Sequence, residues 1–181
     1  NHTGIFDVSH MSQLFIYGGE YLIKKKKKIF PLDLKNLKLN HSKYSFLMDK
    51  DAGIQDDLII TKTNEGFLII LNAACKDDDF KILKELLEEK YKMVLDQNRS
   101  LIAIQGPKSS QILNDVIDGV KDLNFMSGNW FLFQDHKVYI TRSGYTGEDG
   151  FEISVLNDFV NKLTRELINK GSKLIGLGAR D

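Results

Sequence analysis

The region between residues 44 and 72 restricts the possible folds more than any other part of the chain. Two turn sequences, Asp51-Ala-Gly53 and Asn64-Glu-Gly66, separate three apolar segments with the composition of strands: Tyr44–Met48, Leu58–Thr61 and Phe67–Asn72. Connections this short join neighbouring antiparallel strands, because a parallel pair needs a crossover of roughly a dozen residues or more. The region is therefore predicted to be an antiparallel meander.

Helices and further strands accompany this meander without a regular alternation. The patterns predict helices at Phe80–Tyr91, 107–117 and Phe159–Asn169, and strands at Gln13–Tyr17, Leu101–Ile104, Trp130–Phe133, Lys137–Thr141 and Phe151–Val155. Such an irregular order is typical of α+β proteins, and we predict mostly antiparallel sheets with packed helices. With 181 residues, 42% of them hydrophobic, the chain suffices for one domain or a tightly joined pair. We assign residues 1–181 to one domain.

Three consecutive carboxylates, Asp77-Asp-Asp79, precede the predicted helix Phe80–Tyr91. A helix cap or a metal site would explain such a triplet. The cap is favoured because negative charge stabilises a helix N-terminus. One apolar helical face also follows directly, formed by Phe80, Leu83, Leu87 and Tyr91.

The charge balance argues against two classes of partner. Lys and Arg total 25, as do Asp and Glu, so no net field attracts nucleic acid or an anionic membrane. No apolar run approaches the roughly 20 residues that span a bilayer. The run Lys24–Lys28 is interpreted as a solvated helix face rather than a basic address. We expect neither nucleic acid nor membrane among the partners.

The sequence offers little support for metal or thiol chemistry. The four histidines lack the short paired spacing of zinc ligands: His2, His10, His41 and His136. Cys75 is the single cysteine, and we expect it to be a small buried residue rather than a nucleophile.

The segment Arg142–Ile153 contains more functional side chains than a turn requires. It reads Arg-Ser-Gly-Tyr-Thr-Gly-Glu-Asp-Gly-Phe-Glu-Ile. The three glycines permit positive φ and close backbone approach. An aromatic ring comes from Tyr145, and carboxylates come from Glu148, Asp149 and Glu152. Composition alone leaves two interpretations open, a glycine-rich hairpin loop and a ligand-binding loop.

This segment resembles the signature of the aminomethyltransferase family, to which the T-protein of the glycine cleavage system belongs. Five further blocks resemble the family and follow its order: Ile5–Met11, Gly53–Ile59, Leu71–Ala74, Ala103–Pro107 and Gly176–Asp181. Together they cover nearly the whole chain. The resemblance implies a folate-binding aminomethyltransferase-like fold. Family members also carry more chain at both ends, so we expect this sequence to be a fragment that is inactive by itself.

The resemblance implies transfer of a one-carbon unit. In this family the methylene carbon of an aminomethyl group, carried on the lipoyl arm of the H-protein, passes to tetrahydrofolate. Ammonia is released and 5,10-methylenetetrahydrofolate forms. The implied partners are lipoylated H-protein and tetrahydrofolate as co-substrate, without a metal. The compartment would be the mitochondrial matrix for a eukaryotic member and the cytoplasm for a bacterial one.

Ligand-binding roles follow from the same resemblance. Glu152 matches the acid that contacts the pterin, and Tyr145 lies in the same loop with a ring that packs or donates a hydrogen bond. Arg180 matches an arginine that neutralises an anionic part of folate.

Two further residues are implied near the reacting nitrogens. Asp57 matches the family carboxylate that favours charge developing as the amine leaves. Asp56 is the second choice, since neighbouring residues in a strand point to opposite faces. Asn72 is expected to hydrogen-bond the ligand through its amide.

Two alternative functions remain within the resemblance. One is a folate-binding factor for iron–sulfur cluster assembly. Those relatives have a Lys-Gly-Cys element where this chain has Arg142-Ser-Gly-Tyr145, and the enzyme is favoured because that cysteine is absent here. The other is the T-like domain of a folate-linked demethylating oxidase. A flavin domain in the complete protein would distinguish it.

Overall fold

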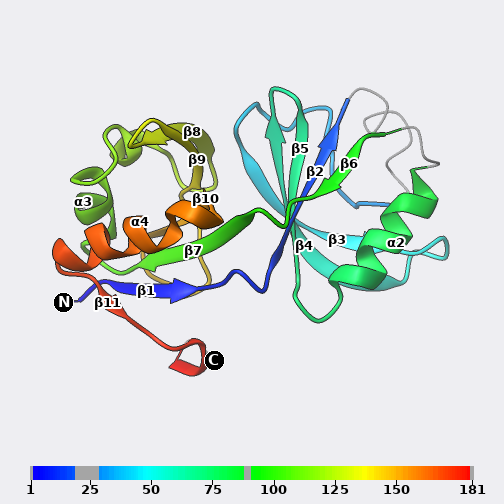
Figure 1. Cartoon of the computed structure of the whole chain (residues 1–181). Coiled ribbons are helices and arrows are strands. Elements are labelled where there is room, and N and C mark those ends of the chain that lie inside the picture. The colour runs from blue at the N-terminus through cyan, green and yellow to red at the C-terminus, as the bar shows by residue number, and fades with distance from the viewer. Residues whose placement is uncertain (1, 19–28, 88–90, 180–181) are drawn as a thin grey trace. The chain divides into compact units, whose positions relative to one another are not determined.

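The computed structural model describes residues 2–18, 29–87 and 91–179. The chain divides into two compact units, one made of Asn1–Ser9 with Asn98–Asp181 and the other of His10–Gln97. Each unit has its own sheet and its own hydrophobic core, and Figure 1 traces the chain through both. The helix face expected at Lys24–Lys28 lies outside the described residues.

The unit His10–Gln97 is built on a five-stranded sheet in the order β3-β4-β5-β2-β6. Its strands are β2 (Ser12–Tyr17), β3 (Ser42–Met48), β4 (Ile54–Thr63), β5 (Gly66–Leu71) and β6 (Met93–Leu95). The pairs in this sheet are antiparallel. The predicted meander is confirmed as β3, β4 and β5. β4 is longer than its apolar segment because polar residues such as Asp56 and Asp57 also pair with β3.

The helix α2 (Lys76–Leu86) packs on one face of this sheet, as Figure 1 shows. The shared core contains Leu83 and Leu87 from the helical segment and Leu14, Ile60 and Ile69 from the sheet. Each of these side chains is at most 1% exposed. Burial of this apolar stripe therefore fixes which side of α2 faces β4.

The start of α2 differs from the prediction. The helix begins at Lys76, so Asp77-Asp-Asp79 forms its first turn, and the capping position belongs to Cys75, whose side chain makes no capping hydrogen bond. The predicted cap is wrong because the apolar spacing used to place the helix does not extend into its polar first turn. The negative charges still lie at the N-terminus, where the helix dipole favours them.

The other unit contains a six-stranded sheet in the order β11-β1-β7-β10-β9-β8. Its strands are β1 (Gly4–Asp7), β7 (Arg99–Gln105), β8 (Gly128–Phe133), β9 (His136–Thr141), β10 (Gly150–Leu156) and β11 (Lys173–Leu174). The pair β1–β11 is parallel and the other pairs are antiparallel. The prediction of an α+β fold with mostly antiparallel sheets is confirmed.

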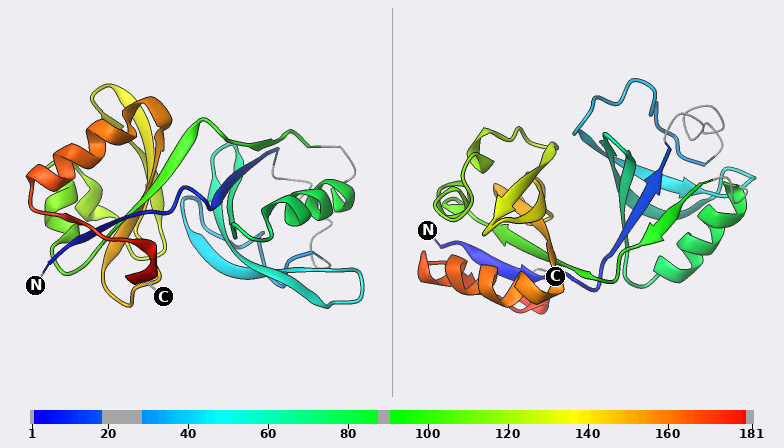
Figure 2. Two further views of the ribbon diagram at one scale, coloured as in Figure 1. Left: turned by 60° about the horizontal axis from the view of Figure 1, so that its bottom comes forward. Right: turned by 45° about the horizontal axis from the view of Figure 1, so that its top comes forward.

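Two helices, α3 (Ser109–Asn114) and α4 (Asn157–Asn169), cover one face of this sheet, as Figure 2 shows. The core between them contains Ile104, Ile140 and Ile153 from the sheet, Ile112 and Leu113 from α3, and Leu163 and Leu167 from α4. Successive side chains of a strand point to opposite faces. Glu152 therefore lies on the face opposite to the helices.

Short 3₁₀ turns complete this unit: η2 (Val120–Asp122) and η3 (Leu177–Ala179). α3 is shorter than the helix predicted for residues 107–117, whereas α4 ends at the predicted residue and begins two residues earlier.

Candidate functional site

The loop between β9 and β10 is closed by an arginine–carboxylate pair. Arg142 donates from Nε to Asp149 Oδ1 at 2.9 Å and from Nη2 to Asp149 Oδ2 at 2.7 Å. Its Nη1 also donates to the carbonyl of Leu123 at 2.9 Å. The hydrogen bonds from Arg142 lower the pKa of Asp149. Two parallel bonds fix direction as well as distance, so both ends of the glycine-rich segment are held in place.

A glutamine from β7 lies inside this loop. The side-chain amide of Gln105 donates from Nε2 to the carbonyl of Ser143 at 3.0 Å and accepts at Oε1 from Thr146 Oγ1 at 2.9 Å. A Cβ atom at Gly144 or Gly150 would collide with this amide. Two of the three glycines in the segment are thus explained by the space that Gln105 occupies.

Glu152 is nearly buried, with 9% of its surface exposed. Its Oε2 accepts a hydrogen bond from Ser143 Oγ at 2.9 Å, and Ser143 Oγ lies 2.9 Å from Thr141 Oγ1. In the sheet Glu152 is paired with Thr141 on one side and Ala103 on the other. The carboxylate is therefore held by its strand and by a hydroxyl, which fix its orientation.

Tyr145 comes from the same segment but differs in burial. It is 51% exposed, whereas Glu152, seven residues later, is 9% exposed. The segment therefore combines an accessible aromatic ring with an oriented carboxylate.

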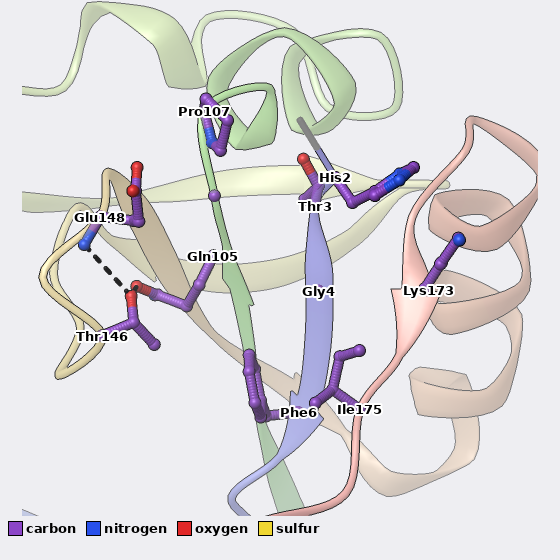
Figure 3. A pocket seen from close by; sticks show the side chains of 11 residues that line it. His2, Thr3, Gly4, Phe6, Gln105, Pro107, Thr146, Glu148, Lys173 and Ile175 are labelled. Carbon is purple, nitrogen blue, oxygen red and sulfur yellow. Dashed lines mark hydrogen bonds between the residues drawn. The ribbon is translucent and has the colours of Figure 1, made fainter. Parts of the chain in front are cut away.

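This unit also contains a cavity of about 500 Å³, shown in Figure 3. Its lining comes from the loop, β1, the end of β7 and the β11 region: His2, Thr3, Gly4, Phe6, Gln105, Gly106, Pro107, Thr146, Glu148, Lys173 and Ile175. In Figure 3 the side chains of Thr146 and Gln105 point toward one another. Glu152 and Tyr145 are not among the lining residues, so the cavity and the Glu152 carboxylate are separate features.

In the other unit, one amide connects two neighbouring carboxylates. Asn72, directly after β5, donates from Nδ2 to Asp57 Oδ1 at 2.9 Å, to the Asp57 carbonyl at 3.0 Å and to Asp56 Oδ1 at 3.1 Å. Although neighbours in a strand point to opposite faces, Asn72 at the end of the adjacent strand reaches both. Its observed contacts are with the protein, and ligand binding by Asn72 stays a prediction.

Each carboxylate also has its own neighbours. A hydrogen bond to Asp57 raises the pKa of the Tyr44 hydroxyl. The charge of Asp56, together with desolvation, raises the pKa of the Cys75 thiol. Cys75 is half-buried, whereas we expected it to be buried. Its raised pKa favours the protonated thiol over the reactive thiolate.

The described residues contain neither a candidate membrane helix nor a candidate metal cluster. No helix among residues 2–18, 29–87 and 91–179 is long and apolar enough to cross a membrane. The His, Cys, Asp and Glu residues of the same ranges form no group of three or more that could hold a metal ion.

Comparison with known proteins identifies the family. The model described as "GCVT N-terminal domain" matches residues 1–181. The chain belongs to this family. This GCVT N-terminal domain is 41% identical over 189 residues to a Schizosaccharomyces pombe protein named "Probable aminomethyltransferase, mitochondrial", covering 99% of the chain and 48% of that protein. It is 35% identical over 195 residues to the "Aminomethyltransferase" of Thermoanaerobacter sp. strain X514, covering 100% and 51%.

A solved structure supports the same assignment. The crystal structure of glycine cleavage system aminomethyltransferase T from Bartonella henselae superposes with a TM-score of 0.88 at 36% identity, covering 99% of this chain and 49% of that one. This GCVT N-terminal domain therefore spans about half the length of the curated relatives it matches.

The structure describes most of the predicted site residues of this GCVT N-terminal domain. Glu152 and Tyr145 lie in one unit, and Asp57 and Asn72 lie in the other. Arg180 lies outside the described residues.

Three supporting residues were not anticipated from the sequence: Gln105, Ser143 and Tyr44. Ser143 and Gln105 lie within segments that resemble the family, Arg142–Ile153 and Ala103–Pro107, and this resemblance could have indicated them.

Proposed function

We propose that this chain is the folate-binding part of an aminomethyltransferase of glycine cleavage. The complete protein would transfer the methylene carbon of the aminomethyl group on the H-protein lipoyl arm to tetrahydrofolate. The observation that carries the proposal is the nearly buried Glu152 carboxylate, oriented by Ser143 within the signature segment of a family-matching chain. Residues 1–181 act together in this role as one functional domain.

The reaction sets clear requirements. The carbon–sulfur bond to the lipoyl arm and the carbon–nitrogen bond to the leaving amine break, and two carbon–nitrogen bonds to folate form. Two protons leave the folate nitrogens, one ending on the sulfur and one on ammonia. The enzyme must therefore position folate against the carbon and stabilise the charge of the departing amine.

Glu152 is proposed to anchor the pterin. The pterin edge presents N–H donors, and a carboxylate with a fixed orientation accepts them without further ordering on binding. Because Glu152 lies on the sheet face opposite to α3 and α4, those helices do not cover it. Tyr145 would pack its exposed ring on the ligand or donate from its hydroxyl.

Asp57 is proposed to act electrostatically near the reacting nitrogens. Its carboxylate accepts from Asn72 and from the Tyr44 hydroxyl, so its position is fixed before substrate arrives. Asn72 would orient Asp57 and would also bind the ligand through the remaining hydrogen-bonding capacity of its amide. Arg180 is proposed to neutralise an anionic part of folate.

The alternative of an iron–sulfur assembly factor has no supporting observation here. The element that carries a cysteine in those relatives is Arg142-Ser-Gly-Tyr145 in this chain, and the single cysteine, Cys75, lies in the other unit.

The test is ammonia release by the complete protein from aminomethylated H-protein, with and without tetrahydrofolate. The proposal predicts tetrahydrofolate-dependent release together with 5,10-methylenetetrahydrofolate. Folate binding without any transfer would refute the enzymatic part.

A further inference from the structure

Asp79, in the first turn of α2, is a buried carboxyl that the proposed reaction does not use. It is 2% exposed, although its neighbours Asp77 and Asp78 in the same turn are exposed. Its Oδ2 atom is buried, and none of the described residues donates a hydrogen bond to it. The same is true of Oδ2 of Asp56 on β4. Two buried carboxyl oxygens without donors would be costly if both groups were ionised.

Asp56 is the neighbouring side chain that acts on Asp79 most strongly, by side-chain contact and by its charge. An ionised carboxylate only accepts hydrogen bonds, so a contact between two of them requires one proton. No lysine or arginine of the described ranges forms an ion pair with Asp56, Asp57 or Asp79. Protonation of one of the carboxyl groups relieves their mutual repulsion.

We infer that Asp79 shares one proton with Asp56 at neutral pH and, through this contact, is a positioning residue for the Asp56–Asp57 pair. The inference rests on the proposed function for its catalytic meaning, since Asp57 and Asp56 are the candidate carboxylates of the reaction. The protonation itself is independent of that function.

The surroundings of Asp79 support this assignment. Desolvation, followed by the hydrogen bond and charge of Asp56 and the charges of Asp78 and Asp57, raises the pKa of Asp79 to about 7. These are the charged groups that face it from α2 and from β4. Cys75, at the start of α2, keeps its proton because its pKa is also raised.

Asp79 is connected to Asp57 through Asp56 and Asn72, so its protonation can influence Asp57. The shared proton occupies the Oδ2 side of Asp56, and Asp56 Oδ1 accepts from Asn72. The same amide donates to Asp57 Oδ1. With the proton present, the contact between Asp79 and Asp56 carries one negative charge less. Loss of the proton places a further negative charge against Asp56, and the resulting repulsion weakens the contact of Asp56 with the Asn72 amide, which also holds Asp57.

The direct test is infrared spectroscopy of the complete protein with isotope-labelled aspartate. The wild type should show the carbonyl band of a protonated aspartic acid that disappears with a midpoint near pH 7. In Asp79→Asn this band should be absent. Asp77→Asn is the matched control, because it removes one exposed carboxylate from the same helical turn and should keep the band. A wild type without the band, or a band that survives in Asp79→Asn, would overturn the inference.

A second variant covers the case in which Asp79→Asn does not fold. Asp56→Asn removes the charged partner but keeps its shape, so the band of Asp79 should persist and titrate at lower pH. An unchanged midpoint in Asp56→Asn would contradict the shared proton.

Kinetics separate positioning from a purely structural role. Wild-type kcat should fall as pH rises above about 7, by about tenfold at one pH unit above the midpoint, whereas Asp79→Asn should lose this component. A structural role would instead lower kcat by the same factor at every pH, which would refute positioning. If the band behaves as expected but no transfer occurs, the proposed function fails and the shared proton stands.

Discussion

Replacing Glu152 by glutamine tests the ligand anchor with little change of shape. One oxygen of the Glu152 carboxylate accepts a hydrogen bond from Ser143, and the residue lies on the sheet face opposite to α3 and α4. In Glu152→Gln an NH₂ group replaces one acceptor oxygen, so one pterin N–H would meet a donor instead of an acceptor. An unsatisfied buried donor costs about 1–3 kcal/mol. At about 1.4 kcal/mol per factor of ten, the Kd for folate should rise about 5- to 150-fold.

The stability of Glu152→Gln should change little, because the Ser143 hydroxyl can rotate to pair with the amide. Folate titration followed by fluorescence measures Kd, and circular dichroism checks the fold. Glu148→Gln is the matched control: it is exposed, belongs to the same loop and lines the cavity of Figure 3. Unchanged affinity in Glu152→Gln with an intact fold removes Glu152 from the site. Weaker binding in Glu148→Gln alone would place the ligand in the cavity instead.

Four further outcomes are expected. Asp57→Asn should lower turnover much more than folate affinity, whereas Asp56→Asn should lower turnover less than Asp57→Asn; steady-state kinetics with the reverse order would mean that the pair is wrongly assigned. Gly144→Ala should displace the Gln105 amide and break its hydrogen bonds with Ser143 and Thr146, lowering the free energy of unfolding by about 2 kcal/mol in urea titration; a loss below about 0.5 kcal/mol would refute that packing. Because burial raises the folded-state pKa of Asp79 from 3.8 to about 7, its contribution to stability is complete below the lower value and is lost as pH rises through the upper one. Asp79→Asn should remove a slope of up to about 1.4 kcal/mol per pH unit between these values, and urea titrations with parallel pH profiles would contradict it. Residues 1–181 alone should show no turnover in an assay beside the complete protein, and equal turnover numbers would mean that the rest is dispensable.

The sequence predicted the meander well because its turns leave few alternatives. Asp51-Ala-Gly53 and Asn64-Glu-Gly66 can join only neighbouring antiparallel strands, and β3, β4 and β5 pair in that way. Three short strands, β1, β6 and β11, were not predicted, since segments of four, three and two residues show no clear periodicity. The start of α2 was missed because its first turn is polar and carries no apolar spacing.

The candidate site was only partly predictable, for a different reason. The resemblance indicated Glu152 and Asp57, but the groups that orient them come from other elements. Gln105 meets Ser143 and Thr146 across 38 and 41 residues of sequence. Asp79 meets Asp56 only because α2 folds back onto β4. Such contacts depend on tertiary packing, and no local pattern encodes them.

Transfer of a one-carbon unit to folate is the activity that we propose for the complete protein. The most direct measurement follows ammonia and 5,10-methylenetetrahydrofolate during incubation of the complete protein with aminomethylated H-protein. Both products should appear in equal amounts, and their rates of formation should depend on tetrahydrofolate and fall sharply in Asp57→Asn. Ammonia release at the same rate in wild type and Asp57→Asn, or no methylenetetrahydrofolate in the presence of bound folate, would contradict this proposal.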